Sequence, residues 1–564
     1  MSFIDKLNRY ELKSKQIVAL ELLLIIGFAA IPLLSSFPYR VNIFLSWEGA
    51  YRLYLGQIPF KDYGIPMGYG YWLIPAMFFK IFGPYMLSLI KAQVFINILA
   101  GLSFRSILKS FKVNTGLRLV GILLFIISYS FFNFWPWYNH TVIVYELIGL
   151  AFLLRFIFSG QVYWKRLILL SAATLLLFLS FFTKQDGGGL AFMLSFFLVV
   201  YHAIVDKKYI DIVSFLALYA IWACVFIMPV ASYDFGYWFN LGQEPHNSRI
   251  HLLDFIKTAF GESKWEKFYI SAMIFVLLIR LKDFKAFITD KQSFLFFLLT
   301  LGILVEALIF QVTSYTPPDN NIFFHSFAFV YLFSLTKISQ HFNRLPQLII
   351  MVSLIMLWWS GVYWKYVERK MLRMFPAMAQ VDDEAISKST YMVSERIENN
   401  INMSEWGFSK LRAFKGIYMP QSTVEGMQRL MQMEEVKNHN PNVLNMTELT
   451  PLAYEIGFEL RKNKPLWYHK GVGMFQREVD QYVAEIKNQE YDVVLFETIP
   501  YLNNFFPEEV YGSLIENYQM VDRFLAPRRP TDSHIEVYIR KAEKNSDEET
   551  ELFEVNEQVE TQNP

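Results

Sequence analysis

The chain has 564 residues, of which 54% are hydrophobic and only 18% are charged, whereas soluble domains carry about 25% charged residues. The net charge of +1 excludes the clustered Lys and Arg of a nucleic-acid-binding surface. The single cysteine, Cys224, excludes a disulfide framework and a cysteine-based metal site.

The shortage of charge is uneven along the chain. Residues up to about Trp364 form apolar runs broken by short charged loops, while the remainder has the composition of an ordinary soluble protein. The sequence therefore predicts an α-helical polytopic membrane domain over residues 1–364 and a C-terminal soluble α/β domain over 365–543. The acidic end, 544–564, is expected to be disordered.

About eleven runs are candidates for membrane-spanning helices, which need about 20 mostly apolar residues. They are 17–34, 85–104, 117–134, 142–158, 166–183, 188–205, 210–230, 268–281, 292–312, 322–338 and 346–364. The first run follows a basic N-terminus and lacks a cleavage site, so we expect a retained anchor. The short run 71–83 is expected to be an interfacial or re-entrant helix, and whether it spans the membrane stays open.

The loops of the membrane domain differ in composition on the two faces. With 71–83 kept out of the count, the Lys- and Arg-rich loops all fall on one side, which predicts a cytoplasmic N-terminus and an extracytoplasmic C-terminal domain. We expect the membrane to be a bacterial inner membrane. Five aromatic, His-, Asn- and carboxylate-rich loops collect on the other side: 35–84, 135–141, 184–187, 231–267 and 313–321. This asymmetry predicts that function lies on the outer face.

The C-terminal half alternates helical and β-like patterns. Helices are expected at 380–400, 421–438, 474–489 and 507–517, and strands at 442–446, 465–468, 491–497, 520–525 and 534–540. The alternation predicts a small α/β domain with a partly parallel sheet. The near-continuous apolar run 491–497 is typical of a buried central strand.

The first outer loop, 35–84, carries two candidate acids. Glu48 follows Trp47 near the bilayer, and such a carboxylate can have a raised pKa and serve as a general base. The alternative is a loop glutamate that faces water. Asp62 has the same two interpretations, and its neighbour Lys61 can be a simple ion-pair partner.

Lys184 and Asp186 interrupt two apolar runs at the outer face, just before three glycines. A lysine at that depth costs a few kcal/mol unless it has an anionic partner or reaches the interface. A lipid phosphate is such a partner, and glycines let backbone N–H groups approach it. The alternative is a tight turn with a lysine that extends to the interface.

Four further outer residues are candidates for substrate contacts: Asn139, His140, Asp319 and His325. Each can instead be a satisfied polar residue or part of a plain connector. The histidines lack HxxH or HExxH spacing, so the sequence defines no metal site, and a divalent metal stays open. Carboxylates within apolar spans are functional candidates by default, and these are Glu21, Glu146 and Glu306.

The first outer loop resembles that of the C-type (GT-C) membrane glycosyltransferases, which include the protein O-mannosyltransferases, the aminoarabinose transferases of lipid A and family-39-like proteins. The resemblance covers roughly residues 17–110 and rests on Trp47-Glu48, Ala50-Tyr51, Gly56, Pro59-Phe60-Lys61-Asp62, Pro66 and Tyr69 to Trp72. Lys184-Gln185 is similar to a Lys-Gly element of these families. Many members carry an acidic pair where this chain has Trp47-Glu48, so Glu48 would replace the missing acid, or the protein is not catalytic.

The resemblance implies an inverting transfer of a sugar from a polyprenyl-phosphate donor to a glycan, lipid or protein acceptor outside the cytoplasm. Glu48 would deprotonate the acceptor hydroxyl. Lys184, Arg52 and Lys61 would stabilise the departing phosphate, and the soluble domain would help to bind the acceptor. We therefore expect Glu48 and Lys184 to converge on one outer cavity.

Other functions stay open. A flippase or transporter for a lipid-linked sugar predicts inverted repeats and broken helices with charges at the bilayer midplane, and the sequence shows no such repeat. A non-catalytic scaffold would use the soluble domain to bind a partner. An oligosaccharide polymerase or ligase shares the architecture, and the sugar, the acceptor and the oligomeric state are not specified by the sequence.

Overall fold

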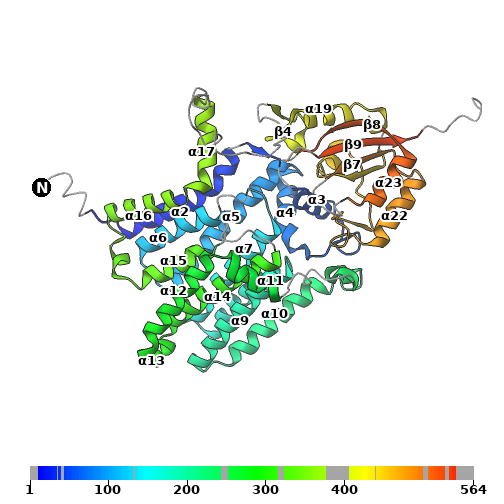
Figure 1. The fold of residues 1–564 in the computed structure, drawn as a ribbon. Helices are drawn as coiled ribbons and strands as arrows, with labels where there is room; N and C mark the ends of the chain where they lie inside the picture. Colours follow the sequence, from blue (N-terminus) through cyan, green and yellow to red (C-terminus); the bar gives the residue numbers. More distant parts are fainter. Residues whose placement is uncertain are drawn as a thin grey trace, which may run out of the picture.

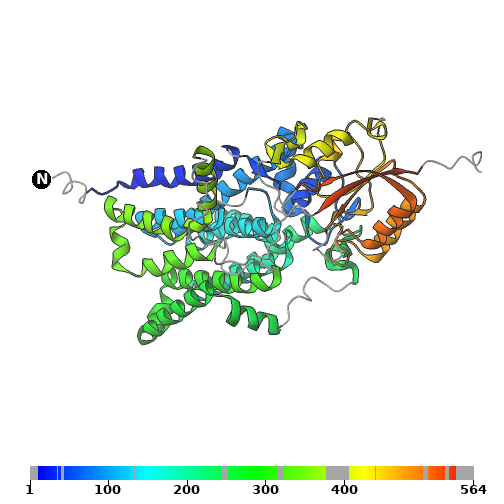
Figure 2. The same cartoon turned by 45° about the horizontal axis from the view of Figure 1, so that its top comes forward.

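The computed structural model describes residues 10–34, 36–39, 43–130, 134–242, 252–314, 323–375, 405–437, 440–499, 506–527 and 533–541. The first two thirds of the chain form a bundle of helices, and the last third forms an α/β domain at one end of the bundle (Figure 1). Helix α13 (Phe284–Thr289) lies at the end away from the sheet in both views (Figures 1 and 2).

Each of the eleven predicted spans overlaps a helix of the bundle. These helices are α2 (Ser14–Ala30), α5 (Met86–Ser110), α6 (Thr115–Phe125), α7 (Tyr138–Phe158), α8 (Tyr163–Phe181), α9 (Gln185–Asp206), α10 (Ile210–Ile227), α12 (Trp265–Arg280), α14 (Lys291–Ser314), α15 (Phe324–Ser334) and α16 (Leu345–Trp358). Within the described part of the chain, seven helical segments are long and apolar enough to cross a membrane. The predicted fold class, a polytopic α-helical membrane protein, is confirmed, while the direction of insertion stays a prediction.

The apolar run 71–83 forms a short helix. The segment Tyr69–Trp72 is a 3-10 turn, and α4 (Leu73–Phe82) has ten residues. Ten residues span about 15 Å at 1.5 Å per residue, about half of the hydrocarbon thickness of a bilayer. The helix therefore has the length of an interfacial or re-entrant element. It ends at Gly83, whose φ of +87° favours glycine.

The last predicted span, 346–364, is not one helix. Helix α16 ends at Trp358, and α17 (Ser360–Met374) begins two residues later. In Figure 1, α17 rises away from the bundle. Charged residues from Lys365 onward explain why this helix does not continue the apolar path, and the expected domain boundary after 364 falls inside it.

The end of the bundle away from the sheet is joined by buried ion pairs. Glu21 accepts hydrogen bonds from Nε of Arg105 and Nε of Arg118, each at 2.6 Å. Arg166 binds Asp211 at 2.8 Å. These arginines, which lie near the ends of α5, α6 and α8, therefore hold helices together at this end.

The α/β domain has a four-stranded sheet in the order β5-β7-β9-β8. Strands β5 (Val443–Met446) and β7 (Val493–Thr498) are parallel, and β9 (His534–Arg540) is antiparallel to both β7 and β8 (Tyr518–Leu525). The buried β7 is central, as its apolar run predicts. The helices are α19 (Gln421–Leu430), α20 (Glu434–Lys437), α21 (Leu452–Ile456), α22 (Gln476–Lys487) and α23 (Glu508–Asn517).

Four expectations for this half need comment. The predicted helix 421–438 is divided into α19 and α20. The predicted strand 465–468 is shorter, because β6 covers only Lys464–Pro465. The predicted helix 380–400 and the tail 544–564 lie outside the described residues.

The first outer loop is joined to the α/β domain by two short parallel strand pairs. Strand β1 (Phe37–Pro38) pairs with β4 (Ile417–Pro420), which also pairs with β3 (Trp406–Phe408). Strand β2 (Tyr63–Gly64) pairs with β6. The first loop and the C-terminal domain therefore lie at the same end of the bundle.

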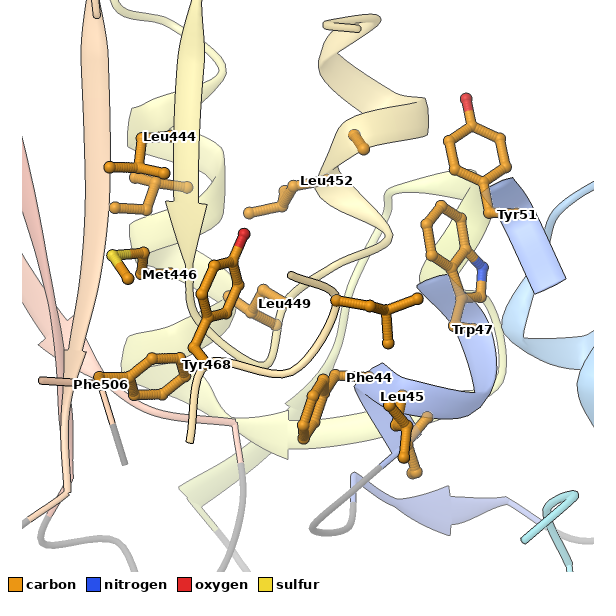
Figure 3. Packing of buried hydrophobic residues seen from close by; sticks show 14 of the residues in the cluster. Phe44, Leu45, Trp47, Tyr51, Leu444, Met446, Leu449, Leu452, Tyr468 and Phe506 are labelled. Carbon is orange, nitrogen blue, oxygen red and sulfur yellow. The ribbon is translucent and has the colours of Figure 1, made fainter. Parts of the chain in front are cut away.

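Helix α3 (Ile43–Tyr54) of this loop shares a hydrophobic core with the α/β domain. Figure 3 shows Phe44 and Trp47 of α3 facing Leu449 and Leu452 of the domain. This shared core holds α3 in a fixed position against the domain, so its polar side chains are fixed as well.

Candidate active site

The first predicted acid, Glu48, lies on α3 and is paired with Arg52 one turn later. Nε and Nη2 of Arg52 contact Oε1 of Glu48 at 2.9 and 2.8 Å. This i,i+4 spacing of acid and base also supports the helix itself. Glu48 is 3% exposed and Arg52 is 2% exposed. Because both contacts go to Oε1, Oε2 is the carboxylate atom that can accept a proton.

Arg52 connects α3 to the C-terminal domain. Its Nη1 donates hydrogen bonds to Oε1 of Gln57 at 2.8 Å and to the carbonyl oxygen of Arg461 at 3.2 Å. Its guanidinium also lies 5.3 Å from the ring centre of Tyr63. The guanidinium is therefore held on several sides, and Glu48 is positioned through it.

A cavity of about 30 Å³ lies beside Glu48, between α3 and the C-terminal domain. Glu48 and Arg52 form one side, and the domain contributes Asn445, Tyr468 and Tyr482 among others. A space of this size holds about one water molecule. The acid is thus enclosed at the junction of two domains.

Burial sets the protonation of this cavity. Removal from water raises the pKa of the Glu48 carboxyl above its ordinary value of 4.5, and the neighbouring Arg52 opposes that shift. Burial also raises the pKa of the Tyr468 hydroxyl, so this phenol keeps its proton. A carboxylate with a raised pKa next to a hydroxyl donor is an arrangement suited to general base catalysis.

Asp62, the second predicted acid, makes its contacts within the turn of the first loop and to the C-terminal domain. Its Oδ2 accepts a hydrogen bond from the N–H of Ile58 at 2.7 Å, and its Oδ1 lies 3.7 Å from Nζ of Lys462. Its carbonyl oxygen accepts from the N–H of Asn463 at 2.7 Å. These contacts hold the turn against the C-terminal domain, and the catalytic role of Asp62 stays a prediction.

Lys184 and Asp186 lie together at the start of α9, separated by 3.1 Å. Nζ of Lys184 lies 4.8 Å from the ring centre of Phe310 and 5.6 Å from that of Tyr138. The glycine after this turn is required by packing, because a Cβ at Gly188 would lie 2.1 Å from the backbone of Phe181.

The expected convergence of Glu48 and Lys184 on one outer cavity stays a prediction. Lys184 is not among the described residues that line the Glu48 cavity. Tyr138, which contacts Lys184, packs against Tyr71 with ring centres 6.2 Å apart, and Tyr71 hydrogen-bonds Ser46. Ser46 and Glu48 are two residues apart on α3, so they point about 200° apart. Lys184 is therefore linked through Tyr138 and Tyr71 to the Ser46 side of α3.

The remaining predicted residues are divided among other places. His140 is buried on α7, with Nδ1 3.3 Å from Nε2 of Gln93 and its ring stacked on Tyr129. Oδ1 of its neighbour Asn139 is buried without a hydrogen-bond partner in the described structure. His325 lies against the rings of Phe324 and Trp359, 4.1 and 4.8 Å away.

Two points of the sequence analysis remain: the predicted substrate contact at Asp319 and a metal site. Asp319 lies outside the described residues. In the described part of the chain, no group of three or more His, Cys, Asp or Glu is placed to hold a metal ion.

The sequence pattern singled out no residue of the C-terminal domain, although several line the Glu48 cavity. Tyr468 and Lys464 come from the segment that begins with β6, and Tyr482 comes from α22. A signal existed, because Trp467-Tyr468-His469 is a dense aromatic run beside a short β-like run. The sequence also did not show that Glu146 and Glu306 face each other across α7 and α14.

Comparisons with known proteins give a limited result. No family model matches the chain, and no curated protein matches it. ArnT from Cupriavidus metallidurans in the apo state is similar in structure, with 10% identity and a TM-score of 0.47 over 92% of this chain and 97% of that chain. The same protein bound to undecaprenyl phosphate has 11% identity and a TM-score of 0.46 over 93% and 98%. Similarity at this level assigns neither a family nor an activity.

Proposed function

We propose that the chain is a membrane glycosyltransferase that moves a sugar from a polyprenyl-phosphate donor to an acceptor on the outer face. The observation that supports this most is the buried Glu48–Arg52 pair at the junction of the first loop and the C-terminal domain. The resemblance of the loop sequence to the C-type glycosyltransferases supports the same reaction. The sugar, the acceptor and the membrane of residence are left open.

The proposed reaction is a single displacement at C1 of the donor sugar. The acceptor hydroxyl attacks C1 while Oε2 of Glu48 takes its proton. The bond from C1 to the phosphate oxygen breaks, and polyprenyl phosphate leaves with the electron pair. One displacement inverts the configuration at C1, and no covalent enzyme intermediate forms.

Arg52 and Lys184 have different roles in this proposal. Arg52 holds the Glu48 carboxylate in place. Lys184, next to the faces of Phe310 and Tyr138, is the candidate for the departing phosphate. Because the cavity beside Glu48 holds about one water, a sugar reaches the carboxylate only if the side chains that close the cavity rearrange.

The experiment is transfer by the purified full chain in proteoliposomes. Polyprenyl phosphates that carry different radiolabelled sugars are offered together with a cell-envelope extract, and the released polyprenyl phosphate is measured. Glu48→Gln should lower release by at least about 100-fold. The matched control is Glu425→Gln, an exposed acid on α19, which should behave as the unaltered chain. No release with any donor, or full release by Glu48→Gln, contradicts the proposal.

A second candidate, a non-catalytic scaffold, is favoured by one observation. Trp47 occupies the position where many C-type glycosyltransferases carry an acid. It is completely buried, and its Nε1 donates a hydrogen bond to the carbonyl oxygen of Pro84 at 3.1 Å. In a scaffold, Glu48→Gln would leave binding of polyprenyl phosphate and of any partner intact, and no donor would be consumed.

A further inference from the structure

A groove lies where three distant segments meet: the turn at 60–64, the segment 233–237 after α10, and the part of the C-terminal domain between β6 and α22. We call it the junction groove. It encloses about 370 Å³, within the range of sites that hold small ligands. The residues that define it are Lys61, Tyr63, Tyr233, Tyr237, Lys464 and Arg477.

Of the three cations among the described residues that line the junction groove, Lys464 and Arg477 are paired with carboxylates and Lys61 is not. Arg477 contacts Asp234 at 2.8 Å and Glu478 at 2.5 Å, which accounts for both carboxylates of the groove. Lys464 is paired with Glu485 at 2.5 Å. Among the described residues, no carboxylate lies within ion-pair distance of Lys61, whose Nζ is 5.4 Å from the ring centre of Tyr233. An anionic ligand would supply the missing partner.

The walls of the junction groove are aromatic. Phe60, Tyr63, Tyr233 and Tyr237 all line it. Phe60, Tyr63 and Tyr237 are at most 2% exposed, so Tyr233, at 36%, is the one of these four whose ring is open to a ligand. An aromatic ring has a negative face, and the C–H groups on the face of a sugar ring are weakly positive. Aromatic walls with a few polar groups at the edge are thus suited to a sugar.

The backbone at the rim of the junction groove has an uncommon conformation in two places. Phe60 has φ of +64° and Asn463 has φ of +58°, a conformation that is rare for a bulky residue such as Phe60. The N–H of Phe60 donates to the carbonyl oxygen of Tyr63 at 2.9 Å, and that of Asn463 donates to Asp62 at 2.7 Å. Such conformations are concentrated at ligand sites, where the surroundings impose them.

The junction groove adjoins the candidate active site. Lys464 lines both the groove and the Glu48 cavity. Tyr63 lines the groove, and its ring also packs against the guanidinium of Arg52. A ligand in the groove would therefore be separated from the Glu48–Arg52 pair by one layer of side chains.

We propose that the junction groove binds a sugar that carries an anionic group, phosphate or carboxylate. This sugar belongs to the acceptor, an assignment that rests on the proposed function. Lys61 binds the anionic group, and Tyr233 packs against the sugar ring. The hydroxyl groups on the far side of the ring then face Lys464 and the Glu48 cavity. Lys61 is given to the acceptor here, in place of the donor phosphate.

Direct binding to the full chain in nanodiscs tests this proposal without turnover. The probes are glucose, glucose 6-phosphate, glucuronate and inorganic phosphate, measured by calorimetry. At least one of the two charged sugars should bind about tenfold or more tightly than glucose and than phosphate, and the better of the two identifies the anionic group. Equal affinity for glucose and the charged sugars, or for phosphate and the charged sugars, overturns the proposal.

Variants assign the binding to the junction groove. Lys61→Ala removes an exposed cation without an ion pair, so the fold should persist, and affinity should fall about fivefold or more. Tyr233→Ala tests the aromatic wall and should weaken both charged sugars. The matched control is Lys487→Ala, an exposed lysine in the last turn of α22, which should leave affinity unchanged. Unchanged binding in Lys61→Ala contradicts the assignment.

One further variant separates this inference from the proposed function. Glu48→Gln should retain binding of the charged sugar while it loses transfer. If transfer also persists in that variant, the proposed function fails and the groove assignment stands. If no probe binds but transfer depends on Glu48, only the groove assignment fails.

Discussion

Two buried glutamates, each held by arginine, lie at opposite ends of the molecule and have different surroundings. Both oxygens of Glu21 are occupied, Oε1 by Arg118 and Oε2 by Arg105, and the arginines come from two other helices. Glu48 is held through one oxygen, by Arg52 of its own helix, and it lines a cavity. The difference teaches that burial and an arginine do not by themselves make an acid functional.

The two glutamates suggest a rule for this chain. An acid whose two oxygens each bind an arginine of another helix joins those helices. An acid bound through one oxygen is oriented and keeps the other for chemistry. Substitutions at both positions and at their partners test whether the two glutamates differ in this way.

The largest expected difference between them is in catalysis. Glu48→Gln should lower transfer by about 10²- to 10⁴-fold, because the variant lacks the proton acceptor. Glu21→Gln should leave transfer per folded molecule unchanged. The measurement is release of polyprenyl phosphate, normalised to the protein that elutes as a single species in detergent. Equal losses in the two variants would remove the distinction.

Loss of Glu21, in contrast, should lower the stability of the fold rather than the rate of transfer. Glu21→Ala leaves the buried Arg118 and the partly buried Arg105 without this counter-charge, which costs about 3–5 kcal/mol of unfolding free energy. The measurement is denaturant unfolding in detergent, with Glu425→Ala as the exposed control, which should change stability by less than about 0.5 kcal/mol. If Glu21→Ala lowers the free energy of unfolding as little as Glu425→Ala does, the ion pairs of Glu21 with Arg105 and Arg118 are not structural.

The role of Arg52 can be separated from its charge. Arg52→Lys keeps the cation but cannot reach Glu48, Gln57 and Arg461 together, so transfer should fall about tenfold through kcat, with KM little changed. Arg52→Gln, which also removes the charge, should be less active than Arg52→Lys. If the lysine variant is no better than the glutamine variant, the charge of Arg52 does not orient the acid.

The pH dependence follows from the raised pKa of Glu48. The carboxyl must be ionised to accept a proton, so kcat/KM should rise with pH, with a midpoint above the ordinary 4.5. For stability the sign is opposite. The folded state keeps this proton where the unfolded state has lost it, so the contribution of Glu48 to the free energy of unfolding falls as pH rises through that window. A rate profile with a midpoint at or below 4.5 would exclude Glu48 as the base.

The smallest expected effect concerns Asp62. Asp62→Ala removes the acceptor for the N–H of Ile58 and should cost about 1 kcal/mol, as loss of a capping acceptor does. Asp62→Asn, which keeps an oxygen in place, should restore most of that stability. Unfolding curves of the two variants decide this. If alanine costs nothing and transfer nevertheless falls, Asp62 is catalytic, as the loop sequence predicts.

The sequence by itself determined where most elements form. Each predicted span overlaps a helix, and β7 is the central strand that its run of apolar residues predicts. It also placed Glu48 in the long loop after the first span, with Arg52 one helical turn away. These features are local, because apolar run length and residue spacing act within one element.

Only the tertiary structure decided which surfaces meet. It joined the first loop to β4 and β6, about four hundred residues later, and so surrounded Glu48 with Tyr468 and Tyr482. Lys184 is not among the described residues that line the Glu48 cavity. The physical reason is that a local pattern specifies a helix and its polar residues, whereas the direction in which each side chain points depends on how the whole chain packs.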